Sequence, residues 1–211
     1  MKLKRLCSIL FCVLCSVSAA VCAPADSIYN GTQIKLDIAS PILTPALYKW
    51  QMQHYELAAN VRLAKRFYPT FELGYAGGST ARGDSIAYTG QGGFFRVGGD
   101  LNPLKKHPES PHAFLVGVRL GTAVQQFTNG PGLKSGVAAD CWGEIVAGCQ
   151  VEIAKVNNTA FYMGWMGRFK CLFTRELTGI PAADMTAIYI PGFGKRDNIA
   201  WGANYYLGWR F

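Results

Sequence analysis

The sequence predicts an all-β chain whose eight strands close into an antiparallel, up-and-down transmembrane β-barrel. Three observations predict it: an export signal at the start, eight later segments of alternating apolar and polar residues, and connections between them that are alternately long and short. Composition agrees. Of the 211 residues, 50% are hydrophobic, only 16% are charged and 24 are Gly, whereas a soluble domain has about 25% charged residues.

Residues 1–23 have the order of a secretory signal peptide. Met1–Arg5 is basic, Leu6–Leu14 is apolar, and small residues follow between Ser16 and Ala20. We expect cleavage after residue 23, or as late as residue 25, with lipid attachment at Cys22 as a variant. Residues 24–211 are then expected to form a single barrel domain.

The first four predicted strands each have one apolar face and one face of charged, polar or small residues, the period-2 pattern of a β-strand. In the first of them, Ile34 and Leu36 oppose Lys35 and Asp37. These four strands are Thr32–Ile38, Tyr55–Leu63, Thr70–Gly77 and Gly93–Leu101.

The last four predicted strands are longer and repeat the pattern. In the fifth, Val116 and Val118 oppose Gly117 and Arg119. These four strands are Ala113–Ala123, Cys141–Ile153, Ala160–Phe173 and Ile199–Phe211. Their length reaches the nine to eleven residues, roughly, that a tilted membrane strand needs.

The alternation fits two architectures. A soluble lipocalin-like barrel in the periplasm turns its apolar faces inward, whereas a membrane barrel turns them outward to lipid. Aromatic residues gather near the strand ends, as in interfacial girdles, and the polar faces carry full charges. We therefore predict the membrane barrel and keep the soluble one as the alternative. Two sets of residues carry this prediction: Trp165, Phe169, Leu207 and Trp209 face lipid, and Arg96, Arg119, Glu144 and Arg168 face the lumen.

The connections sort by length when the N-terminus is placed in the periplasm. Short periplasmic turns and longer outer loops are typical of membrane barrels. The expected outer loops are residues 39–54, 78–92, 124–140 and 174–198, and the expected inner turns are residues 64–69, 102–112 and 154–159.

The end of the chain resembles the C-terminal assembly signal of bacterial outer-membrane proteins. It has a terminal aromatic, Phe211, preceded at alternate positions by Trp209, Leu207 and Tyr205. The resemblance implies a bacterial outer-membrane location, with outer-membrane lipid and the barrel-assembly machinery as partners.

The mature chain also resembles an uncharacterised family of small outer-membrane β-barrel proteins, a domain of unknown function. The likeness covers roughly residues 30–211 and is best in Arg96–Asp100, Met163–Trp165 and Tyr189–Lys195. Because that family has no known activity, the resemblance implies a fold and a location but no chemistry.

Thirteen charged residues fall on the faces predicted to line the lumen. They are Lys35, Asp37, Glu56, Arg62, Glu72, Arg96, Asp100, Arg119, Glu144, Glu152, Arg168, Lys170 and Arg210. Their signs nearly balance, and the interior of an eight-stranded barrel is only just wide enough for side chains. We expect a charge network that closes the lumen and gives the barrel a structural or surface-interaction role. A narrow pore, or a barrel that binds a small ligand or lipid, is the alternative.

The last outer loop contains apolar residues that are unusual on a solvated surface. Tyr189, Ile190, Pro191 and Phe193 are the candidates for contact with an unknown extracellular or membrane partner. Packing of the loop over the barrel mouth explains them equally well.

Other function classes find no support in the sequence. No Lys/Arg run is longer than two residues, so we expect no nucleic-acid binding. His54, His107 and His112 share no metal-ligand spacing, and we expect neither a metal nor a cofactor. No local motif supplies catalytic residues, so the chain is predicted not to be an enzyme. A membrane enzyme acting on lipid at the barrel mouth, the rival hypothesis, would need a nucleophile and a base.

Overall fold

The structure is a computed structural model. It describes residues 29–47, 52–63, 66–82, 85–104, 112–128, 135–157, 159–174 and 188–211. The predicted signal peptide, its cleavage site and Cys22 lie outside the described residues. So do His107 and most of the connection between residues 102 and 112.

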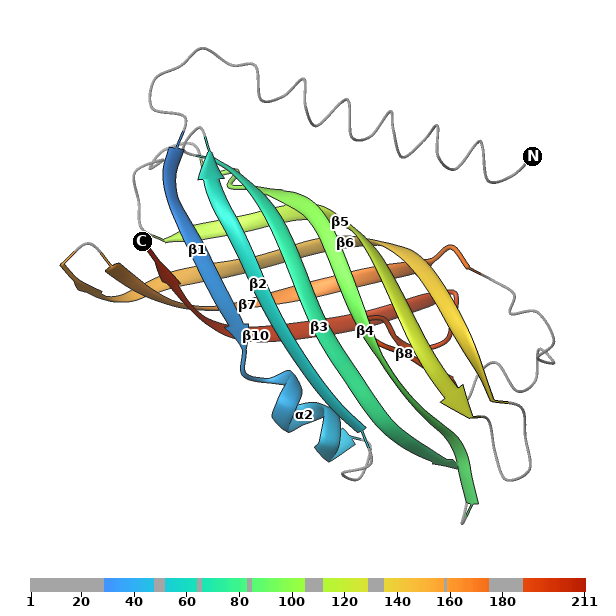
Figure 1. Cartoon of the computed structure of the whole chain (residues 1–211). Coiled ribbons are helices and arrows are strands. Elements are labelled where there is room, and N and C mark those ends of the chain that lie inside the picture. The colour runs from blue at the N-terminus through green and yellow to red at the C-terminus, as the bar shows by residue number, and fades with distance from the viewer. Residues whose placement is uncertain are drawn as a thin grey trace, which may run out of the picture.

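Eight long strands form a closed antiparallel barrel, as predicted (Figure 1). They are β1 (Tyr29–Asp37), β2 (Met52–Leu63), β3 (Phe67–Arg82), β4 (Ser85–Leu101), β5 (Ala113–Thr128), β6 (Ser135–Val156), β7 (Thr159–Leu172) and β10 (Ile199–Arg210). Each strand pairs with the next along the chain, and β1 closes the barrel against β10, with Ile34 opposite Trp209. The short strands β8 (Tyr189–Ile190) and β9 (Gly194–Lys195) form a separate hairpin.

The barrel has two different ends. We call the end where β1 begins and β10 finishes the turn end, and the opposite end the loop end. At the loop end, β3 to β6 continue well past the other strands, so the predicted loops 78–92 and 124–140 are mostly strand. The alternation in these stretches is masked by Gly, Gln and Thr, which is why the sequence suggested loops there.

The sidedness predicted for the strands is confirmed. In β5, Leu115 and Arg119 are buried while Val116 and Val118 are exposed. Trp165 and Leu207 are exposed on the outer side, whereas Arg96, Arg119, Glu144 and Arg168 are buried inside. On the outer side, Phe169 packs edge-to-face on Trp201, with ring centroids 4.8 Å apart. Half-buried Trp209 shares this outer face with Leu207 because side chains two apart in a strand point the same way.

Glycine on the inner side makes room for large neighbours. A Cβ at Gly121 would lie 2.2 Å from Cε2 of Trp142, and one at Gly98 would lie 2.8 Å from Cδ of Arg119. Both distances are below van der Waals contact, so the Trp142 ring and the Arg119 side chain occupy space that only glycine leaves free.

A short helix, α2 (Ser40–Leu47), follows β1 within the predicted loop 39–54 and was not predicted. Asp37, the last residue of β1, accepts hydrogen bonds from the backbone N–H groups of Ala39 and Ser40 at 2.9 and 3.2 Å. Such a carboxylate satisfies donors that a helix start leaves free. Among the described residues, no helix is long and apolar enough to cross a membrane.

Candidate functional site in the barrel lumen

The middle of the lumen holds a network of three arginines and three glutamates. Arg168 is at its centre: Nη1 lies 2.9 Å from Glu72 Oε2 and 2.9 Å from Glu144 Oε2, and Nη2 lies 3.1 Å from Glu56 Oε1. Arg96 contacts the same three carboxylates, each at 2.9 Å. Each glutamate therefore has at least two arginine contacts, and the charges neutralise one another.

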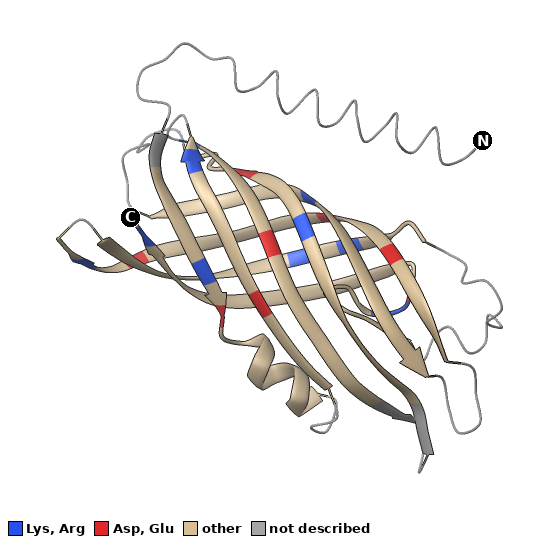
Figure 2. Cartoon of the chain, viewed as in Figure 1, with Lys and Arg blue, Asp and Glu red and all other residues tan. Residues whose placement is uncertain are grey.

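Six consecutive strands each contribute one member of this network. They are Glu56 of β2, Glu72 of β3, Arg96 of β4, Arg119 of β5, Glu144 of β6 and Arg168 of β7. The register places Glu72 directly opposite Arg96, and Arg119 directly opposite Glu144. The charged residues therefore cluster around the middle of the barrel wall (Figure 2).

The network extends toward β1, β4 and β10. Arg119 Nη2 lies 2.7 Å from Asp100 Oδ2, and Arg119 Nε lies 3.2 Å from Glu72 Oε1. On the other side, Arg168 donates to the amide of Asn204, which in turn donates to Asp37. The side chain that caps α2 is therefore part of the lumen network.

Lys35 and Lys170 are buried without a carboxylate at salt-bridge distance among the described side chains. The Lys35 ammonium lies 4.6 Å from the ring centroid of Tyr206. Lys170 Nζ donates to the carbonyl oxygens of Gly192 and Phe193 at 2.8 and 3.1 Å.

All thirteen predicted lumen charges lie on the inner side of the barrel. Eleven of them are buried, and the two at the turn end, Glu152 and Arg210, are half-buried. These two form a long contact, with Arg210 Nη2 3.7 Å from Glu152 Oε2. The Tyr162 hydroxyl also donates to Glu152, at 3.1 Å.

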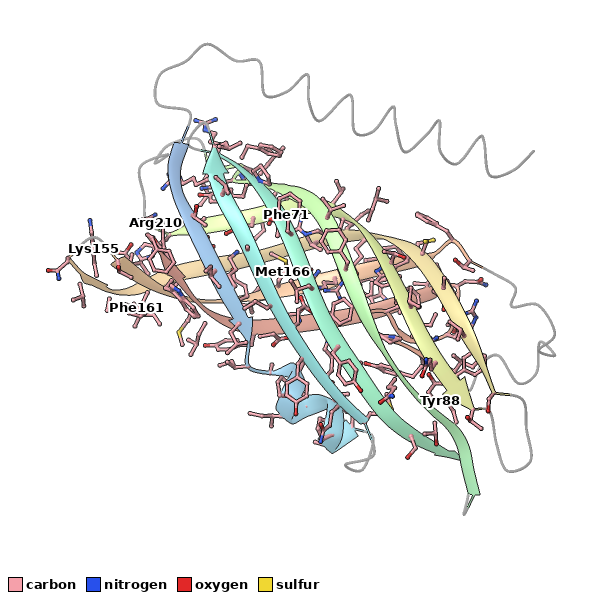
Figure 3. The ribbon with its side chains drawn as sticks, in the orientation of Figure 1. Phe71, Tyr88, Lys155, Phe161, Met166 and Arg210 are labelled. Carbon is pink, nitrogen blue, oxygen red and sulfur yellow. The ribbon has the colours of Figure 1, made fainter. Side chains whose placement is uncertain are left out.

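Apolar side chains, which were not predicted, fill the lumen on both sides of the charges. Toward the turn end lies a cluster that includes Leu115, Val146 and Met166. Toward the loop end lies another that includes Phe94 and Trp142. Figure 3 labels Met166 in the middle of the barrel and Tyr88 at the loop end. The parity of the strands could have placed Trp142 and Val146 inside, because they alternate in step with Glu144.

Among the side chains of the network the lumen has a cavity of about 20 Å³. Lys35, Glu72, Arg168 and Tyr206 are among its lining residues. This volume suits roughly one water molecule. Most of its lining residues are charged or polar, and the space is too small for an organic ligand.

The residues predicted as an outer contact are instead inside the barrel. Ile190 and Phe193 are 0% and 1% exposed, Tyr189 is 6% exposed, and Pro191 is buried as well. The β8–β9 hairpin folds back into the loop end, so the prediction of a partner contact is wrong for these four residues. The hairpin is buried there because the lumen offers apolar surface to its side chains. Arg96 and Lys170 also donate hydrogen bonds to its backbone carbonyl groups.

Further contacts, besides those of Lys170, hold the hairpin and the residue after it in place. The Tyr88 hydroxyl donates to the Tyr189 carbonyl at 2.9 Å, and Arg96 Nη2 donates to the Gly192 carbonyl at 2.6 Å. The Phe193 ring packs edge-to-face on Trp142, with ring centroids 5.8 Å apart. Arg196 forms a salt bridge with Asp140, at 2.7 Å. Asp140 and Arg196 were not among the predicted lumen charges, because both lie in stretches interpreted as loops.

The predicted assembly signal lies on the outer side of β10 and at the end of the chain. Tyr205, Leu207 and Phe211 are exposed there. The Phe211 backbone N–H donates to the Thr32 carbonyl at 3.0 Å, which continues the pairing of β10 with β1 to the last residue.

The site links neighbouring strands through paired charges. The carboxylates of Glu56, Glu72 and Glu144 each lie within salt-bridge distance of Arg96 and Arg168. In the part of the chain that the structure describes, no three His, Cys, Asp or Glu side chains are grouped so that they could hold a metal ion.

The chain was compared with known proteins, solved structures and protein families. No curated protein and no solved structure matches the chain. One family model does match, over residues 2–130, which covers the chain through β5 and includes Arg96–Asp100 but neither Met163–Trp165 nor Tyr189–Lys195. With that match spanning more than half of its length, the chain belongs to the family described as a domain of unknown function, DUF6048.

Proposed function

We propose that the chain is a structural β-barrel of the bacterial outer membrane, with a lumen closed by its own side chains. One observation carries the proposal. On the eight barrel strands, among the side chains whose exposure is described, exposed positions carry no Asp, Glu, Lys or Arg except Lys155, which lies at the projecting tip of β6–β7 (Figure 3). The buried side of the same strands holds eleven of the predicted charges.

The size of the apolar outer surface supports contact with lipid. Leu73, Val118 and Ile145 are each 58% exposed, and they lie on β3, β5 and β6. A monomer in water rarely exposes a continuous apolar patch of more than a few hundred Å². The soluble lipocalin-like alternative needs these side chains inside, so the observed sidedness favours the membrane.

Two exposed tyrosines near the loop end resemble an interfacial girdle. The Tyr55 hydroxyl donates to Gln53 at 3.2 Å, and the Tyr75 hydroxyl donates to Gln91 at 2.9 Å. In a girdle the ring lies at the edge of the hydrocarbon and the hydroxyl reaches polar groups. Gln53 and Gln91 would then mark the border, at the loop end, of the surface that contacts hydrocarbon.

The filled lumen supports a closed barrel rather than a pore. Arginine–glutamate contacts span the middle, and the β8–β9 hairpin occupies the loop end. The same pairing supports a barrel that is not an enzyme, because its buried carboxylates are neutralised by arginines. We further propose that outer-membrane lipid and the barrel-assembly machinery are its partners, and that no cofactor is used.

Membrane fractionation followed by electrophoresis tests the proposal. We expect the full-length protein in the outer-membrane fraction, with different mobilities in boiled and unboiled samples. Deleting Phe211 should lower the amount of the unboiled, folded form, because β10 loses its terminal aromatic and its last backbone bond to Thr32. Recovery of the wild-type protein in the soluble periplasmic fraction would overturn the proposal.

A further inference from the structure

Helix α2 turns its apolar side away from the barrel. Ser40 and Pro45 are buried, whereas Ile42, Leu43 and Leu47 are 64%, 53% and 78% exposed. None of the eight residues of the helix is charged. A helix on a water-covered surface has the opposite arrangement, with its polar face outward.

The orientation of α2 is fixed by the lumen network. The Ser40 hydroxyl donates to Asp37 Oδ2 at 2.5 Å, and the backbone N–H groups of Ala39 and Ser40 donate to Asp37 Oδ1. Asp37 also accepts a hydrogen bond from Asn204, which is bonded to Arg168. The exposure of the apolar side is therefore a consequence of how the helix is anchored.

The helix lies where the apolar outer surface of the barrel would otherwise be interrupted. Strand β1 stops at Asp37, opposite Tyr206, while its neighbours β2 and β10 continue toward the loop end. Those neighbours still expose Tyr55 and Trp201, at 48% and 77%. Helix α2 lies beside the loop end of β2, directly beyond the end of β1 (Figure 1).

We propose that α2 is an interfacial helix that lies in the membrane surface, with Ile42, Leu43 and Leu47 among lipid acyl chains. An apolar face that continues the apolar surface of the neighbouring strands fits lipid, and helices lie in this way at the boundary between headgroups and chains. The inference rests on the proposed membrane location of the barrel. It adds a membrane-contact element that the strands alone do not provide.

Fluorescence quenching in lipid vesicles tests the inference separately from the proposed function. A genetically encoded, polarity-sensitive fluorescent amino acid replaces Leu43, Val118 or Asp197, one at a time, in the full chain reconstituted in phosphatidylcholine vesicles. Val118 reports on the barrel's outer surface, and exposed Asp197 of the loop end is the control for water. Quenchers are a lipid nitroxide near the headgroup, a lipid nitroxide near the chain end, and iodide in the buffer. Leu47 is labelled in the same way, as a second position on the helix in case the Leu43 variant does not fold.

We expect the headgroup-proximal nitroxide to quench the label at position 43 most strongly, and the chain-end nitroxide to quench the label at position 118 most strongly. Iodide should quench only position 197.

Iodide quenching at 43 and 47, with lipid quenching at 118, would overturn the helix inference and leave the membrane barrel standing. Protection of 43 and 47 from all three quenchers would indicate a protein contact and would also overturn it. Iodide quenching at 118 would overturn the proposed membrane location itself.

Discussion

At the scale of single residues, Arg168 is the side chain on which the interior depends most. It contacts Glu56, Glu72 and Glu144 and is 4% exposed. A buried ion pair is weak evidence for stability by itself, but removal of one partner leaves a buried charge without compensation. In this lumen, loss of the Arg168 side chain alone would remove a partner from three carboxylates at once.

Arg168→Met should therefore lower the free energy of unfolding by about 3–5 kcal/mol, because it leaves buried carboxylates with fewer partners. Arg210→Met is the matched control. Arg210 is half-buried at the turn end, where it has one long ion pair of 3.7 Å and lies 5.2 Å from the ring centroid of Tyr162, so we expect a loss of about 0–1 kcal/mol. Urea unfolding of the reconstituted barrel measures both. Equal effects of the two substitutions would show that the network is not what stabilises the interior.

Gly121 provides a second test at this scale. Gly121→Ala should destabilise the barrel by about 1–3 kcal/mol, because the added Cβ overlaps the Trp142 ring and forces it to move. Gly167→Ala is the control, since the nearest atom to a Cβ there is 3.7 Å away. The midpoint of heat-induced conversion from the unboiled to the boiled gel mobility compares the two. The packing argument fails if Gly167→Ala lowers that midpoint as much as Gly121→Ala does.

The inward residues could be predicted from the sequence, but their pairing could not. Alternation alone placed Glu72, Arg119 and Glu144 inside, because the side-chain period of a strand is two. Arg119 lies directly opposite Glu144 in the register, yet its described ion pairs are with Glu72 and Asp100. In a narrow barrel a long side chain reaches several strands, so partners depend on three-dimensional packing that spacing does not contain.

At the scale of elements, the β8–β9 hairpin shows why a loop's role was not predictable. Apolar residues in an outer segment fit both partner contact and self-packing. The structure decides for self-packing because Arg96 and Lys170 donate to carbonyl groups of the hairpin, and the lumen buries Ile190 and Phe193. Helix α2 was also missed, although Asp37 and Ser40-Pro41 form a typical helix start. Pro45 lies inside the helix, where proline is normally unfavourable, so the sequence pattern there is not that of a regular helix.

Phe193→Ala tests whether the hairpin is a permanent part of the core. We expect a loss of about 3–5 kcal/mol in the free energy of unfolding, as for a buried phenylalanine elsewhere in a core. Lys195→Ala, an exposed residue of the same hairpin, should change it by no more than about 0.5 kcal/mol. Urea unfolding measures both variants. A neutral Phe193→Ala would mean that the hairpin spends much of its time outside the lumen.

At the scale of the whole molecule, the barrel is apolar outside and charged inside. Sequence alternation predicted this sidedness and the number of strands, because both depend on local patterns. The true strand lengths were not predicted, since β3 to β6 extend through Gly-, Gln- and Thr-rich stretches where alternation is weak. We propose that the barrel is inserted in a membrane, because contact with lipid would stabilise its apolar outer surface.

Val118→Arg tests the outer surface. If Val118 faces the middle of the membrane, we expect a loss of about 2–4 kcal/mol on folding into lipid vesicles, against about 0–1 kcal/mol for a site near the interface. Gln126→Arg on the same strand provides that interfacial control, because Gln126 is exposed near the loop end. Denaturant-dependent folding in vesicles gives both values. A Val118→Arg variant that folds as well as Gln126→Arg would place this surface in water.

The conductance of the wild-type protein in a planar lipid bilayer tests the central claim of a membrane barrel with a closed lumen most directly. We expect the purified protein to insert without forming steady open channels, because the arginine–glutamate network and the β8–β9 hairpin fill the described lumen and the cavity beside Lys35 and Arg168 has a volume of only about 20 Å³. Insertion is verified in the same membranes by protection of the barrel from protease. Steady, large single-channel steps from inserted wild-type protein would contradict the claim and favour a pore.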